Sequence, residues 1–197
     1  MELLPLVFTS GWASGVNAYA TVLLLGLLGR YAGIDGIPAA LERTDVLVVT
    51  GALYALEFVT DKIPYVDSGW DAISTAIRPT VGAILGLLLT GDASSLDQAV
   101  AATLGGTTAL ASHAVKASLR LAVNTSPEPA SNIVLSTVED FSVAGALALA
   151  VFQPWTAFGI VAVLLGGGGI IAVALTRRVR RGYRRWRERR REALEHV

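Results

Sequence analysis

The sequence predicts an all-α, polytopic membrane bundle of about six transmembrane helices. Of the 197 residues, 53% are hydrophobic and 16% are charged, whereas a soluble domain carries about 25% charged residues. Long apolar runs recur along the chain with only short connections between them. Acids and bases lie inside or beside these runs, and an ionisable group at the centre of a bilayer costs about 2.5–3.5 kcal/mol by insertion scales. The charges therefore indicate a bundle with a polar interior.

Six apolar runs correspond to the predicted spans. They cover residues 3–29, 46–59, 72–90, 99–123, 133–152 and 155–176. Because a spanning helix needs about 20 mostly apolar residues, the chain has room for these spans but not for a second soluble domain. The first run lacks a basic segment before it and is expected to be a retained helix rather than a signal peptide. The absence of cysteine excludes disulfides and thiolate chemistry.

The charge distribution predicts two domains and an orientation. Residues 1–176, the transmembrane domain, carry 6 basic and 13 acidic side chains, a formal charge of −7, and residues 177–197, the tail, carry +7. A basic segment directly after an apolar helix stays in the cytoplasm. With six spans, both termini of a protein of the inner (plasma) membrane are then expected to be cytoplasmic. The arginine-rich tail is expected to bind anionic lipid, and nucleic acid is not expected as its partner.

The start of the first run is small and polar, from Ser10 to Tyr19. Such residues allow two backbones to approach closely in lipid, and they also occur where a helix is broken around a binding site. The favoured interpretation is a continuous, close-packed helix in which Asn17 forms a hydrogen bond to another helix.

Polar residues inside the runs form the predicted cleft for an ion or a substrate. They are Asn17, Glu57, Asp61, Arg78, His113, Lys116, Arg120, Glu139 and Asp140. Glu57 and Asp61 are four residues apart and share a helix face, which suits proton coupling or cation binding. The alternative, which is favoured, is that they are interfacial or paired with Lys116 and Arg120.

Two proline-containing turns are predicted on the cytoplasmic side. Their residues are Pro64, Asp67, Ser68 and Asp71 in the first turn, and Asn124, Pro127, Glu128, Ser131 and Asn132 in the second. Pro64 and Gly69 are expected to end the second helix, and Ser68 or Asp71 to cap the third. The aspartates are expected to brace the turn rather than to bind metal.

An internal two-helix repeat is predicted from the alignment of residues 56–87 with 119–149. It implies a parallel repeat and places Arg78 opposite Asp140, so an ion pair of Arg78 with Asp140 or Glu139 is expected. A rival alignment sets residues 14–21 over 105–112 and implies an inverted repeat instead.

The two turns also carry a family resemblance. Residues 61–71 followed by Arg78-Pro79, and residues 124–132 followed by Glu139-Asp140, resemble the signature turns of a bacterial membrane-protein family known as domain of unknown function 4126. The resemblance extends over about residues 5–165. It implies a small integral membrane protein and no particular activity.

The sequence contains no convincing catalytic or metal-binding pattern. His113 has only His196 as a second histidine, and neither a nucleophile elbow nor an HExxH motif occurs. We therefore expect no enzyme, no cofactor and no metal site. The first hypothesis is a transporter or channel for a small solute or ion, acting through the polar cleft. The alternative is a non-transporting scaffold or partner-binding protein whose buried charges are paired with one another. An enzyme acting on lipid ranks third, and a homo-oligomer is left open.

Overall fold

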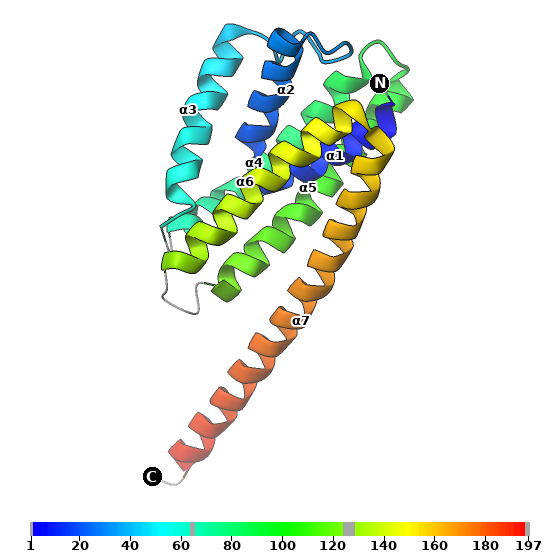
Figure 1. Ribbon diagram of the computed structural model, residues 1–197. Coiled ribbons are helices and arrows are strands. Elements are labelled where there is room, and N and C mark those ends of the chain that lie inside the picture. The colour runs from blue at the N-terminus through cyan, green and yellow to red at the C-terminus, as the bar shows by residue number, and fades with distance from the viewer. Residues whose placement is uncertain (1, 64–65, 124–128, 196–197) are drawn as a thin grey trace.

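The computed structural model is a bundle of helices and describes residues 2–63, 66–123 and 129–195. Within these residues it has seven helices and no strand (Figure 1). The helices are α1 (Leu3–Val16), α2 (Ala18–Ala32), α3 (Thr44–Thr60), α4 (Val66–Thr90), α5 (Ser95–Val123), α6 (Pro129–Phe152) and α7 (Pro154–Glu195).

The first two helices form a hairpin that enters the bundle from one end and returns to it (Figure 1). Leu3 and Leu4, at the start of α1, line a cavity together with Ala93 at the turn between α4 and α5. At the far end of α1, Lys116 of α5 donates a hydrogen bond to the carbonyl of Val16 over 2.9 Å. The helix α1 therefore runs beside α5 in the same direction, and α2 leads the chain back.

A break at Asn17 creates the hairpin, so the prediction of one continuous helix over residues 3–29 was wrong. Asn17 has φ −151° and ψ 102°, an extended conformation that no helix contains. Its side-chain oxygen accepts a hydrogen bond from the amide of Ala20 over 2.9 Å, so it caps the N-terminus of α2. The interpretation of the small, polar stretch as a broken helix is thus the correct one.

The close packing expected for the same stretch is also present. A Cβ atom on Gly11 would lie 2.7 Å from the carbonyl oxygen of Gly105 in α5, and one on Gly82 in α4 would lie at the same distance from that oxygen. Small residues allow α1, α4 and α5 to approach backbone to backbone. Ser14 strengthens this contact by donating a hydrogen bond to the carbonyl of Arg78 over 2.9 Å.

The distribution of side chains is that of a protein surrounded by lipid. Glu57, Arg78, Lys116 and Arg120 are all at most 3% exposed, whereas large apolar side chains such as Ile170 at 74% lie on the outside. In water, both the burial of the charged side chains and the exposure of the large apolar ones would be unfavourable. Several apolar helices with a charged interior indicate a membrane protein.

Three helical segments among the described residues are long and apolar enough to cross a membrane. They are Val66–Thr90, Ala130–Phe152 and Pro154–Arg178. This is fewer than the six predicted spans. The break at Asn17 divides the first predicted span into two short helices, α3 has only 17 residues, and α5 carries His113, Lys116 and Arg120.

The helix boundaries differ from the predicted ones around the first turn. The helix α4 begins at Val66, six residues before the predicted run, so Gly69 lies inside a helix instead of ending one. Pro79 also lies inside α4 without ending it. The predicted turn residues Pro64, Asn124, Pro127 and Glu128 lie outside the described residues.

The basic segment continues α7 as a helix to Glu195, and it extends past the rest of the bundle (Figure 1, red). The boundary between transmembrane domain and tail at residue 176 stays a prediction. The start of α1, in contrast, lies at the other end of the bundle, beside the turn between α4 and α5. The start of α1 and the end of α7 thus lie at opposite ends of the bundle, and the side of the membrane on which each terminus lies stays a prediction.

The internal repeat also stays a prediction. The helices α3 and α5 run in one direction along the bundle, and α4 and α6 run in the opposite direction, as the parallel alignment requires (Figure 1). The rival alignment also stays a prediction, because residues 14–21 extend across the break at Asn17 from α1 into α2.

We predict that Gly82→Ala loosens the contact between α4 and α5. The added Cβ would lie 2.7 Å from both the Gly105 oxygen and the Ala109 Cβ, and overpacking of this kind costs about 1–3 kcal/mol. The control is Gly145→Ala in α6, where the new Cβ meets nothing within 4 Å. The midpoint of unfolding in detergent solution should fall for the first variant only; equal midpoints would contradict the packing described.

Candidate functional site

Charged side chains from four helices meet at the tip of the α1–α2 hairpin. We call this group the charge cluster. Its members are Glu57 and Asp61 at the end of α3, Asp67, Asp71 and Arg78 of α4, Lys116 and Arg120 of α5, and Glu139 of α6.

The helix α4 presents its share of the charge cluster on one face. Asp67, Asp71, Ser74 and Arg78 follow one another at intervals of four, three and four residues, and all are buried. Residues at these intervals lie on the same side of a helix. The same rule places His113, Lys116 and Arg120 of α5 on the face that meets α4 and the hairpin tip. The polar faces of α4 and α5 thus face each other in the interior of the bundle, where apolar side chains would normally lie.

Arg78 is a fully buried cation that joins three helices. Its guanidinium lies 2.5 Å from Glu57 Oε1 and 3.0 Å from Asp71 Oδ1, and its side chain is 1% exposed. It also donates a hydrogen bond to the carbonyl oxygen of Gly15 over 3.4 Å. The break in the first helix therefore supplies a main-chain acceptor to a buried arginine.

The neighbourhood of Arg78 fixes the protonation state of His113. A nitrogen of Arg78 lies 2.7 Å from His113 Nδ1, and a guanidinium can only donate, so Nδ1 must be the acceptor. The proton of the neutral ring is then on Nε2, which donates to Thr75 Oγ1 over 3.0 Å. The Thr75 hydroxyl in turn donates to the carbonyl of Asp71 over 2.9 Å. His113 thus acts as a neutral link and adds no charge to the cluster.

Lys116 is shared among three carboxylates. Its ammonium nitrogen lies 2.9 Å from Asp61, 3.5 Å from Glu139 and 3.9 Å from Glu57. The same nitrogen donates to the carbonyl of Val16. An ammonium is a point charge with three donors, so it can exchange one of these acids for another with little movement.

Arg120 lies at the end of the charge cluster that is nearest to the α3–α4 turn. It donates to the main-chain carbonyl of Asp61 over 2.7 Å and to the Asp61 carboxylate over 3.0 Å. It also pairs with Glu139, and Asp67 lies 3.5 Å away. The planar guanidinium suits this position, since it offers several donors in fixed directions.

Acids outnumber bases in the charge cluster. In the part of the chain that the structure describes, five carboxylates face three cations, and Asp140 lies at the edge, where Asn17 Nδ2 donates to it over 3.4 Å. Among the described residues, Glu57 Oε2, Asp61 Oδ1 and Asp71 Oδ2 accept no hydrogen bond. Buried oxygens of this kind can take up a proton or a small cation. No group of three or more acids and histidines in the described ranges has the arrangement of a metal site.

A cavity of about 190 Å³ reaches the charge cluster from the side. It is lined by Ser68, Asp71, Ala72, Thr75, Ala117 and Leu121. Asp71 is only 4% exposed, so the cavity opens on one buried carboxylate and not on the whole cluster.

The structure brings the predicted cleft residues together but changes some of their partners. Asp61 pairs with Lys116 and Arg120, as the favoured interpretation of the second run predicted. The predicted pair of Arg78 with Asp140 or Glu139 was wrong, because Arg78 pairs with Glu57 and Asp71.

Asp67 and Asp71 were predicted to lie in a turn, whereas both lie in α4 and join the charge cluster. Their spacing from Arg78 along one helix face was the signal that could have shown this. Ser68 lies in the first turn of α4, and Ser131 and Asn132 lie in the first turn of α6, with Asn132 buried. The carbonyls of Gly15 and Val16 were missed because main-chain acceptors leave no trace in residue types.

The comparisons with known proteins identify the family. A family model described as a domain of unknown function (DUF4126) matches residues 4–176. The chain therefore belongs to this family, and the match is somewhat longer than the resemblance noted above and ends before the basic tail. No curated protein and no solved structure matches the chain.

We predict strong energetic coupling between Arg78 and Glu57. Removing one partner of a buried pair costs about 3–5 kcal/mol, because the other charge remains uncompensated. Arg78→Met should therefore lower the free energy of unfolding strongly, and adding Glu57→Gln should restore part of the loss. A double-mutant cycle measures the interaction, which should reach about 0.5–3 kcal/mol.

The exposed pair of Arg43 and Asp45 is the matched control for this cycle. The two side chains lie 2.7 Å apart but are more than 60% exposed, and surface pairs contribute about 0–1 kcal/mol. Strict additivity at Arg78 and Glu57 would contradict the pairing.

Proposed function

We propose that this member of the family is a small membrane transporter or channel that moves a proton or another small cation through the charge cluster. The observation that carries the proposal is the surplus of carboxylates over cations in a buried site at a helix break. A surplus of negative charge in a low-dielectric interior must be compensated, and a mobile cation is the compensation that transport requires. The proposal assigns no catalytic step and no cofactor to the chain.

The membrane arrangement that fits the bundle has five spans and one re-entrant hairpin. The helices α3 to α7 cross from one end of the bundle to the other, while α1 and α2 enter and leave at the same end (Figure 1). The protein then lies in the inner membrane, with the basic end of α7 in the cytoplasm. Irregular backbone at membrane depth is tolerated where it is buried in protein, as Asn17 is, with 2% of its surface exposed.

Broken helices and buried charges occur together in transporters for a physical reason. A helix end leaves carbonyl groups without partners inside the helix, and these groups can bind cations. Here the carbonyls of Gly15 and Val16 accept hydrogen bonds from Arg78 and Lys116. The two basic side chains thus occupy the acceptors that an incoming cation would use.

A route for the cation follows from these contacts. The cavity beside Asp71 gives access, and Asp71 and Glu57 share Arg78. A cation that binds Asp71 weakens the ion pair between Asp71 and Arg78. The cation then moves to Glu57 and from there to the carboxylates around Lys116. Because Lys116 is within 3.9 Å of three acids, it can release one acid while it remains paired with the others.

A scaffold is the second candidate, and one observation favours it. Each cation of the charge cluster is already paired and at most 3% exposed, and the cavity at Asp71 reaches only one carboxylate. Under this hypothesis the charges hold the bundle together, and a partner binds elsewhere. The two candidates differ in whether any ion crosses the bilayer.

We predict that Asp71→Asn and Glu57→Gln each lower cation flux at least about tenfold in proteoliposomes. Both changes remove a negative charge and keep the shape of the side chain. The measurement is flux through the purified full chain for a panel of monovalent cations and for protons, with and without a pH gradient.

Asp45→Asn is the matched control, because this exposed acid pairs with Arg43 and lies outside the charge cluster. Its flux should equal that of the unaltered protein. No flux for any cation with a folded protein would eliminate the transporter in favour of the scaffold.

We also predict the sidedness of three positions. Reporters fused at the N-terminus and inserted after Asp92 should lie on the same side of the membrane, and a reporter after Val197 on the opposite side. Leu3 lines a cavity together with Ala93, which fixes the first two positions at one end of the bundle. If the reporters at the N-terminus and after Val197 lie on the same side of the membrane, the number of spans is even and the five-span arrangement is wrong.

A further inference from the structure

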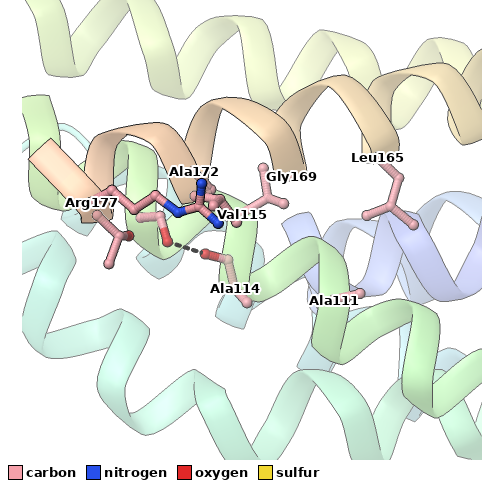
Figure 2. A pocket seen from close by; sticks show the side chains of 10 residues that line it. Ala111, Ala114, Val115, Leu165, Gly169, Ala172 and Arg177 are labelled. Atoms are coloured by element: carbon pink, nitrogen blue, oxygen red, sulfur yellow. Dashed lines mark hydrogen bonds between the residues drawn. The ribbon is translucent and has the colours of Figure 1, made fainter.

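A groove between α5 and α7 lies away from the charge cluster. It encloses about 500 Å³, a volume within the range of about 300–1,000 Å³ that is usual for ligand sites. Small residues leave it open: Ala111 and Ala114 on α5, and Gly169 and Ala172 on α7 (Figure 2). The two helices are in close contact beside it, where a Cβ atom on Gly168 would lie 2.7 Å from Val115.

The groove has about the length of one lipid chain. It extends along α7 from Leu165 to Arg177, which at 1.5 Å per residue is about 18 Å. Half of a bilayer's hydrocarbon core is about 15 Å thick. Since α7 begins at Pro154, Leu165 lies near the middle of the span, and the groove occupies the half that ends at the basic segment.

A cation, Arg177, enters the groove from its end on α7, and its guanidinium lies beside Ala172 and Val115 (Figure 2). Figure 2 shows the Arg177 side chain lying along the groove from the α7 side. No acid among the described residues forms an ion pair with Arg177, which is exposed. An arginine binds phosphate through two parallel hydrogen bonds, and it is the natural partner of an anionic head group.

We propose that this groove binds one phospholipid of the cytoplasmic leaflet that has an anionic head group. One acyl chain lies between α5 and α7, and the phosphate pairs with Arg177. The site is discrete and holds one lipid, which distinguishes it from the general attraction of ten tail arginines to an anionic surface. It is independent of the proposed transport, because no member of the charge cluster lines the groove.

Native mass spectrometry of the full chain in detergent tests the proposal. The probes are phosphatidylglycerol and phosphatidylcholine with identical acyl chains. We expect one tightly bound phosphatidylglycerol for each chain. Gly169→Leu should remove it, because a Cβ at Gly169 meets nothing within 4 Å and the larger side chain fills the groove. The control Gly166→Leu has equally free space on the same helix but does not line the groove, so it should keep the lipid.

A second pair of variants tests the head group separately. Arg177→Gln should lower the preference for phosphatidylglycerol over phosphatidylcholine about fivefold, the effect of one basic residue at an anionic surface. Arg181→Gln, which alters a tail arginine outside the groove, should leave the preference unchanged.

Three outcomes would overturn the proposal. Equal losses for Arg177→Gln and Arg181→Gln would show diffuse adsorption of the tail. Retention of the lipid by Gly169→Leu would place the lipid elsewhere. Loss of a dimer, rather than of a lipid, in Gly169→Leu would show that a second copy of the chain fills the groove.

Discussion

The bundle depends on the neutralisation of three buried cations by groups that are distant in sequence. Lys116 shows the constraint most clearly, since its ammonium group joins the carbonyl of Val16 to carboxylates from α3 and α6. No helix supplies all of these partners, so the lysine is satisfied only when the hairpin tip and both neighbouring helices are in place. In a medium without water the alternative is an unpaired charge, and the arrangement of the helices follows from its cost.

The break at Asn17 also helps to neutralise the buried cations. A continuous helix would use the carbonyls of Gly15 and Val16 within its own hydrogen-bond ladder. Because the helix ends there, the carbonyls are free to accept hydrogen bonds from Arg78 and Lys116. The cap formed by the Asn17 side chain starts α2 in a new direction, and the hairpin and the charge cluster therefore stabilise each other.

Much of the fold could be predicted from the sequence, because apolar runs and one-sided charge patterns are local features. The pairing of Asp61 with Lys116 and Arg120 was among the predictions. Most of the polar residues that were assigned to the cleft are buried, although their role in a cleft stays a prediction. The partners of Arg78 could not be predicted. They depend on how α3, α4 and α1 are placed in space, and the weak repeat that was used to infer them placed Arg78 opposite the wrong helix. The break at Asn17 was not the favoured prediction, because small polar residues occur both at close helix contacts and at helix ends.

The charge balance separates a transporting cluster from a purely structural one. A network whose only task is to hold helices together is most stable when its charges cancel, since each additional charge in a low-dielectric interior is unfavourable. Here five carboxylates meet three cations, and His113 is held neutral by its contact with Arg78. Acids are in excess, and Glu57 Oε2 and Asp71 Oδ2 accept no hydrogen bond from the described residues. This surplus of acid, next to a cavity that reaches Asp71, is the basis on which we propose that the site receives a cation. For this reason we rank transport above a structural role, although every fixed cation in the cluster already has a partner.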